Sequence, residues 1–428
     1  MLRLIPGFIL TVVLISPVTV QALVGDTEGV FGMDGRLSTL AAVGSYSKLP
    51  SFFKNKDLDY FIQANLRLMA GGRPLDRLSY EIHAVQGMDL TSADNNGLWL
   101  DAAAARYQAL DGTWDQFAEG DARGRLTLDR LNVKLSFPWA DLTLGRQAIT
   151  FGKAYFWNPL DIFSPFEAQQ FDRDYKTGVD AVRLDIPIRN FSGINFIGVL
   201  GREITPPGYF LNRRKTWDSS WYGSALLLRL YTTVVEWDLA IQGGKVYGGY
   251  QIGGGAVGEI GSLEIRVEAA YFAAGGKSTP LPFPLKGELL EDHWTAVFGL
   301  GRRFANSFTF EMEYLFNGAG DPDNLEASLV RLNHGASLHL GRHLLGLMIS
   351  YDIISILNAR MVWIYSCSDR SSFLQPMLSL SLSDEAEFLF GAAVSLGRRP
   401  ELDGLIPRLR SEFGIYPDFY FIELKYYF

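Results

Sequence analysis

The chain has 428 residues and a formal net charge of −8, from 39 Lys and Arg against 47 Asp and Glu. Its single cysteine excludes a disulfide framework, a cysteine-rich zinc module and a Cys-x-x-Cys-His haem attachment site. The 48% hydrophobic fraction excludes intrinsic disorder, and the mild acidity without basic runs argues against nucleic acid as a partner. With 44 glycines and 13% aromatic residues, the composition favours β-structure with many turns.

Residues 1–22 have the order of a secretory signal peptide. Arg3 supplies the positive start, Leu4 to Ile15 form an apolar run, and Ala22 ends a segment of small residues suited to cleavage. An uncleaved membrane anchor is the alternative, but the apolar run is shorter than the ~20 residues that a spanning helix needs. We expect residues 23–428 to form one exported domain, because no linker or low-complexity tract divides them.

After the signal, the dominant pattern is the alternation of apolar and polar residues that marks β-strands. One example has Phe308, Phe310, Met312, Tyr314 and Phe316 separated by Thr309, Glu311 and Glu313. Nineteen segments carry such signals: 30–46, 58–70, 77–88, 125–137, 141–151, 178–188, 191–201, 220–231, 233–245, 248–258, 262–273, 293–304, 307–317, 328–340, 343–352, 356–366, 372–382, 386–397 and 418–428.

The segment lengths distinguish a membrane barrel from a soluble β-sandwich. The segments run about 9–13 residues, as tilted membrane-spanning strands do, whereas sandwich strands are mostly ~5–6 residues long. We therefore predict an all-β fold, a transmembrane antiparallel β-barrel of the bacterial outer-membrane type. A single-chain barrel of this kind has an even number of strands, so one of the nineteen is missed, split or fused, and we predict 18–20 strands.

The connections fall into two length classes. Short ones are predicted at 138–141, 259–261 and 341–342, and long ones at about 89–124, 152–177, 202–219, 274–292 and 398–417. The first four long connections fall at every second connection or a multiple of it, and so at one end of the predicted strands, as in barrels with tight periplasmic turns and long external loops. The last is out of phase by one, which we attribute to a strand missed or split after residue 292.

The last strand carries a further barrel signal. Tyr420, Ile422, Leu424, Tyr426 and Phe428 share one face, and the chain ends on an aromatic residue. This resembles the terminal strand of bacterial outer-membrane proteins, which implies that Phe428 is read by the barrel-assembly machinery.

Charged residues between the apolar positions should face away from lipid, because a charge on the lipid face costs ~2–4 kcal/mol near the midplane. They could select solutes by charge, or they could bond one another and stabilise the wall, which we favour for any single residue. The lumen-facing candidates are Arg130, Lys134, Arg183, Asp185, Glu236, Asp238, Glu264, Arg266, Glu268, Glu311, Glu313, Arg331 and His339.

The segment 151–177 combines an apolar, aromatic half with a charged end. Its apolar half cannot remain in water, so we expect it to fold against the barrel, either inward as a constriction or over the outer rim. Its candidate residues are Tyr155, Trp157, Phe163, Phe166, Phe171, Asp172, Arg173 and Asp174.

We predict no metal site, cofactor or catalytic residue. His334 and His339 would lie on opposite faces of a strand, since their separation is odd, and His339 and His343 would straddle a turn. No set of Ser, His and acidic residues recurs at matched phase on neighbouring predicted strands.

The block 145–152, GRQAITFG, continuing through 157–165, WNPLDIFSP, resembles a signature of porin-like bacterial outer-membrane proteins. The resemblance implies a passage across the outer membrane. Some such proteins form conduits with multihaem c-type cytochromes, so a barrel that encloses an electron-carrying partner is the alternative function. An outer-membrane barrel enzyme is a less favoured third. Outer-membrane lipid is the expected surrounding in each case.

Overall fold

The computed structural model describes residues 24–26, 29–54, 56–92, 106–203, 219–404 and 406–428, so the predicted signal peptide lies outside the described residues. In the described part, eighteen antiparallel strands form one closed barrel, and the last strand pairs with the first. They are β2 (Gly32–Ser45), β3 (Leu58–Leu75), β4 (Leu78–Thr91), β6 (Ala122–Ser136), β7 (Asp141–Gln147), β8 (Val179–Arg189), β9 (Ser192–Val199), β10 (Ala225–Val234), β11 (Trp237–Val246), β12 (Gly249–Ile260), β13 (Leu263–Ala274), β14 (His293–Arg303), β15 (Thr309–Asn317), β16 (His343–Ile354), β17 (Leu357–Ser366), β18 (Ser371–Ser381), β19 (Ala386–Leu396) and β22 (Asp418–Tyr427).

Several smaller elements lie outside the set of eighteen barrel strands. The short strand β1 (Val24–Gly25) pairs with β2, and β5 (Thr113–Glu119) pairs with β6 beyond the end of β7. The remaining elements are the hairpin β20 (Glu401–Asp403) and β21 (Ile406–Arg408), the helix α2 (Leu325–Asn333), and the 3₁₀ turns η1 (Ser51–Phe53) and η2 (Phe413–Ile415). No helix that the structure describes has the length and apolar character to cross a membrane.

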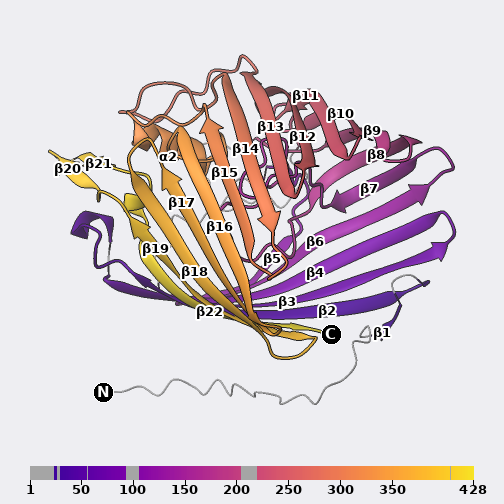
Figure 1. Ribbon diagram of the computed structural model, residues 1–428, viewed down its shortest axis with the longest axis horizontal. Helices are drawn as coiled ribbons and strands as arrows, with labels where there is room; N and C mark the ends of the chain where they lie inside the picture. The colour runs from indigo at the N-terminus through magenta and orange to yellow at the C-terminus, as the bar shows by residue number, and fades with distance from the viewer. Residues whose placement is uncertain (1–23, 27–28, 55, 93–105, 204–218, 405) are drawn as a thin grey trace.

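The connections sort by length between the two ends of the barrel, as predicted. One end, the turn end, carries tight turns such as residues 76–77, 190–191 and 261–262. The other, the loop end, carries the long connections that hold α2 and the β20–β21 hairpin, although 247–248 is short. Figure 1 shows α2 and this hairpin at the left of the barrel, while the C-terminus lies at the lower right. In outer-membrane barrels the tight turns are periplasmic.

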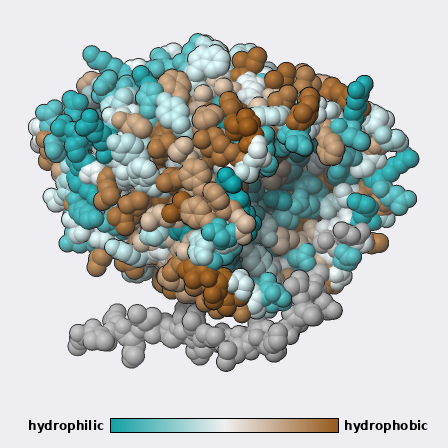
Figure 2. Space-filling model, viewed as in Figure 1, coloured by the Kyte–Doolittle hydropathy of each residue, from teal (hydrophilic) through white to brown (hydrophobic). Residues whose placement is uncertain are grey.

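The alternation places apolar side chains outside and polar ones inside. On β22, Tyr420 and Ile422 are 56% and 49% exposed, whereas Glu423 and Lys425 are 3% and 6% exposed. Figure 2 shows the same contrast, with hydrophobic residues across the outer face and a hollow lined by hydrophilic residues. In the described part of the chain no second sheet packs on this apolar outer face. Such an exterior is suited to contact with lipid, not water.

One predicted strand is wrong. Residues 328–340 overlap the helix α2, so the number of barrel strands falls from nineteen to eighteen. With this strand removed, all five predicted long connections fall at the same end of the barrel. Leu325, Leu329 and Leu332 are spaced as on one helix face, and the side chain of Asn324 accepts a hydrogen bond from the Ala327 N–H as an N-cap. In the part of the chain that the structure describes, no barrel strand was missed or split after residue 292, and the strands β20 and β21 form a separate hairpin. The predicted short turn at 341–342 belongs to the long connection 318–342.

Candidate functional site: a loop folded into the barrel lumen

The connection between β7 and β8, residues 148–178, folds into the lumen, and we call it the inner loop. Its start is shaped by Gly145, whose φ is +112° and where a Cβ would lie 2.2 Å from the carbonyl oxygen of Leu131. Arg146 follows, with Nε 2.7 Å from the carboxylate of the neighbouring Asp180. The block that resembles porin-like proteins therefore builds the point where the chain leaves the wall.

Apolar side chains anchor the inner loop to two parts of the wall. Phe156 and Trp157 are buried against residues of β14 to β17, among them Val297 and Leu344. Phe163 is fully buried in a second cluster formed with β8 to β11. These two anchors hold the loop across the lumen, because each aromatic residue buries a large area against a different set of strands.

Two wall carboxylates bind the backbone of the inner loop. Glu313 of β15 accepts hydrogen bonds from the N–H groups of Tyr155, Phe156 and Trp157. Glu268 of β13 accepts one of 2.6 Å from the N–H of Lys153. Charge-assisted bonds to several backbone donors are strong. These carboxylates are almost fully buried, so their role is to position the loop instead of meeting solutes directly.

A buried ion pair closes the inner loop on itself. The Nζ of Lys176 lies 2.5 Å and 2.6 Å from the two carboxylate oxygens of Asp161, and it also donates to the carbonyl oxygen of Ile149. Burial raises the pKa of Asp161 to about 6, although Lys176 opposes the shift. Burial also lowers the pKa of Lys176. The pair ties the beginning, middle and end of the loop together.

The charged end of the loop binds the first and last strands of the barrel. Asp172 lies 2.7 Å from Nη2 of Arg36 on β2 and 3.1 Å from Nζ of Lys425 on β22. Burial favours a higher pKa for Asp172, but the charges of Lys425 and Arg36 outweigh it and lower the pKa. Phe171 stacks on Phe421 of β22 with ring centroids 4.4 Å apart.

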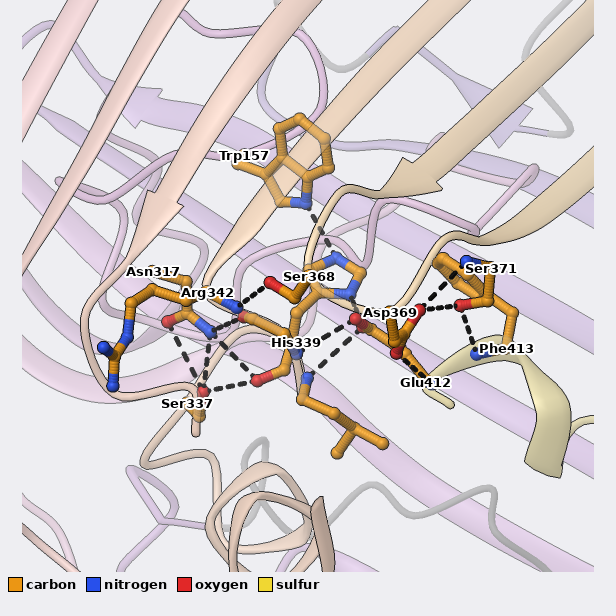
Figure 3. Close-up of polar contacts among 12 residues, drawn as sticks. Trp157, Asn317, Ser337, His339, Arg342, Ser368, Asp369, Ser371, Glu412 and Phe413 are labelled. Atoms are coloured by element: carbon orange, nitrogen blue, oxygen red, sulfur yellow. Dashed lines mark hydrogen bonds and ion pairs between the residues drawn. The ribbon is translucent and has the colours of Figure 1, made fainter. Parts of the chain in front are cut away.

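Figure 3 shows a polar network that joins the inner loop to three other connections. The indole Nε1–H of Trp157 donates to Nε2 of His339, 2.8 Å away, and Nδ1 of His339 lies 2.5 Å from Oε1 of Glu412. The backbone N–H of Glu412 donates to Asp369, whose carboxylate also accepts from Ser371. These residues come from 318–342, 367–370 and 397–417 as well as β18, so the network links the loop-end connections into one unit.

Two cavities lie on opposite sides of the inner loop. The larger, of about 460 Å³, lies between the loop and the connection 318–342. Its wall combines aromatic residues with amide and hydroxyl groups, including Tyr107, Phe166, Tyr247, Asn158, Gln169, Gln251 and Thr295. The smaller, of about 260 Å³, is lined by Lys153 and Leu160 of the loop together with Phe191 of a tight turn. The loop thus divides the lumen into a compartment on each side.

Most of the predicted lumen-facing residues lie on the inner face of the wall. By the alternation of exposed and buried residues these are Arg130, Lys134, Arg183, Asp185, Asp238, Glu264, Arg266, Glu268, Glu311 and Glu313. Many are paired, as Arg266 is with Glu311 at 2.5 Å and Arg130 with Glu81 at 2.7 Å. The wall-stabilising interpretation therefore fits these pairs better than free charged rows.

Three of the predicted lumen-facing residues are not on the wall. Glu236 is exposed in the tight turn between β10 and β11, where its φ is +67°. Arg331 lies on α2, where it pairs with Glu291, and His339 lies in the connection that follows the helix. The strand predictions for 233–245 and 328–340 placed them wrongly, since a turn and a helix interrupt the alternation there.

The eight predicted residues of the constriction or rim all belong to the inner loop. Trp157 and Phe163 are buried against the wall, while Phe166 lines the larger cavity. Arg173 donates to carbonyl oxygens of the loop itself, including that of Tyr155 at 2.8 Å. The segment therefore lies inside the barrel instead of over the rim.

Several residues that hold the loop were not predicted. Arg36 and Lys425 occupy polar positions of alternating strands, and that signal was available in the sequence. No sequence signal pointed to Glu412, because it lies 73 residues from His339 in a segment without periodicity.

The fold is similar to that of solved outer-membrane porins of the Occ/OprD family. Acinetobacter baumannii OccAB2 aligns with a TM-score of 0.55 and 9% identity over 94% of this chain and 99% of that chain. Pseudomonas aeruginosa OccK11 (OpdR) gives 0.52 and 12% over 95% and 99%, and OccK5 (OpdH) of the same organism gives 0.53 and 11% over 92% and 97%. No protein-family model matches the chain, and no curated protein matches its sequence.

The chain thus has the porin barrel fold, which confirms the predicted fold class and the porin-like resemblance. Nothing in the structure or in these similarities supports the electron-conduit alternative.

Proposed function

We propose that this protein is a channel for small hydrophilic solutes in the bacterial outer membrane. The observation that carries the proposal is a closed barrel with an apolar exterior whose lumen is narrowed by a loop anchored to the inner wall. The likeness in fold to outer-membrane porins supports both the channel and its location. The proposal assigns no catalytic reaction to the chain.

The inner loop would make the passage selective instead of general. A solute entering from the loop end meets the larger cavity, whose aromatic and amide groups offer apolar contact and hydrogen bonds. Sites of this kind bind small molecules through a few placed polar groups on an apolar lining. The lining also carries Arg106, Asp161 and Glu167, of which Asp161 is already paired with Lys176.

Conductance in planar lipid bilayers tests the proposal. The purified mature chain should give small, discrete currents, and a variant in which residues 154–172 are replaced by a short Gly-Ser linker should give currents several-fold larger. A matched control shortens the exposed β20–β21 hairpin, which lies outside the lumen and should leave the current unchanged. The absence of current from both the wild type and the loop-shortened variant, with correctly folded protein, would overturn the proposal.

A further inference from the structure

His339 is held between one hydrogen-bond donor and one acceptor. An indole N–H can only donate, so the 2.8 Å contact with Trp157 requires that Nε2 of His339 accepts and carries no proton. The ring proton is therefore on Nδ1, where it is donated to Oε1 of Glu412 at 2.5 Å. In this arrangement the imidazole is neutral, and its tautomer is fixed by its two partners.

Protonation of His339 would change its hydrogen bond with Trp157 but not its contact with Glu412. On the other side, Glu412 also accepts from the backbone N–H of Gly341 at 3.0 Å, and its own N–H donates to Asp369. Burial, followed by the charge of Glu412, raises the pKa of the nearby Tyr416, which therefore stays a neutral phenol. A protonated His339 would keep its ion pair with Glu412, because Nδ1–H already points there.

We propose that His339 is a proton-operated latch for the inner loop. A proton taken from the solvent onto Nε2 turns the acceptor of the Trp157 bond into a second donor, so that two N–H groups face each other. The bond is lost, and the buried indole N–H is left without its partner, which is a costly state. Histidine is the side chain whose charge ordinarily changes between pH 5 and 8, so the latch opens on mild acidification.

Release of Trp157 loosens the anchored half of the loop. Trp157 packs beside Phe156 in the cluster that holds the loop against β14 to β17. It is also the residue whose side-chain bond joins the loop to the connections 318–342 and 397–417 through His339 and Glu412. The inference rests on the proposed function, since the predicted result of release is freer passage through the lumen.

Two variants separate the latch from other effects of pH. His339→Gln supplies a carbonyl oxygen that accepts from Trp157 but does not take a proton, so it keeps the latch closed. Trp157→Phe keeps an aromatic ring in the cluster but removes the N–H. Between pH 7.5 and 5.0 we expect the open probability of the wild type to rise about tenfold or more, the factor associated with one buried hydrogen bond. His339→Gln should stay low at both values, and Trp157→Phe should be high at both.

A wild type without pH response would overturn the latch, and so would a full response in His339→Gln. The second result would mean that another group is responsible for the pH response. Asp161 is then the alternative, because its pKa of about 6 lies between the two pH values compared. As a matched control, His343→Gln removes a histidine on β16 that contacts Tyr314 on the outer face, and it should leave the response unchanged.

A spectroscopic measurement tests the latch even if no current is observed. ¹⁵N NMR of histidine-labelled protein in micelles at pH 7.5, assigned by the signal lost in His339→Gln, should show Nε2 unprotonated and Nδ1 protonated. Protonation of Nε2 at this pH would contradict the latch. A silent channel at every pH would instead contradict the proposed function, so the two failures are distinguishable.

Discussion

The carboxylate of Glu313 on β15 accepts a 2.8 Å hydrogen bond from the backbone N–H of Phe156 in the inner loop. Phe156 is itself buried against the strands around Glu313, so a polar bond and an apolar contact hold the same point of the loop. A carboxylate on the inner face of the barrel thus provides the loop with an attachment site. The predictions below follow from this dual attachment.

Glu313→Gln should loosen the inner loop. The amide keeps one acceptor oxygen but loses the charge and the second acceptor that three backbone N–H groups share. The loss of a buried bond costs about 1–3 kcal/mol, which corresponds to an increase of ~5–150-fold in the population of the released loop. Single-channel recordings should show longer and larger open states. Glu264→Gln, at a lumen-facing carboxylate paired with Arg266 near the turn end, should not.

Asp161→Asn should make the inner loop accessible to protease. The substitution leaves the Lys176 ammonium buried without its partner, and breaking a buried pair from one side costs about 3–5 kcal/mol. Chymotrypsin should then cleave at Phe166 or Phe171, with the barrel still folded. The double variant Asp161→Asn/Lys176→Met removes both charges and should recover most of the protection. Equal protection of the single variant and the wild type would contradict this role of the pair.

Neutralising Asp172 and Asp174 should shift the channel toward anions. Both carboxylates lie within 3.1 Å of Arg36 or Lys425, so their replacement by Asn removes two negative charges from beside these cationic side chains and leaves Lys425 only the more distant Glu423, 3.9 Å away. The ratio of chloride to potassium permeability, from zero-current potentials in a KCl gradient, should rise about twofold or more. Asp403→Asn on the exposed hairpin serves as the control, and a shift of the same size in it would count against a local effect.

Deletion of Phe428 should reduce the amount of folded barrel in the outer membrane. The backbone of Phe428 bonds to Gly35 in both directions, and a Cβ on Gly35 would lie 2.2 Å from its ring, so the ring lies directly over that glycine. Phe428→Trp should assemble, because an aromatic terminus is retained. Heat-modifiability on gels of membrane fractions measures the folded amount. Normal assembly of the deletion variant would show that the assembly machinery does not require Phe428.

The sequence predicted the barrel because alternation is a local signal that each strand carries independently. It failed over 328–340, where Val330, Leu332, Leu338 and Leu340 alternate in part but Gly335 separates a helix from a loop. It also failed at Glu236, since a two-residue turn interrupts the pattern without a glycine.

The site was harder to predict than the wall. Composition predicted that the apolar half of residues 151–177 could not remain in water, and Phe156, Trp157 and Phe163 of that half are indeed buried. Its attachment depends on contacts between distant segments, such as Trp157 with His339 and His339 with Glu412. No periodic pattern encodes such pairs, because they arise only when the closed ring brings the loops of one end together.

The most direct test of the channel through this lumen is chemical block of its current. In a Cys367→Ser background, Gln169→Cys places a thiol at the wall of the larger cavity, and Ile252→Cys places one on the exposed outer face. A cationic thiol reagent added from the loop end should reduce the current of the Gln169→Cys channel several-fold and leave the Ile252→Cys channel unchanged. An unaltered current after confirmed modification of Gln169→Cys would contradict passage through the cavity beside the inner loop.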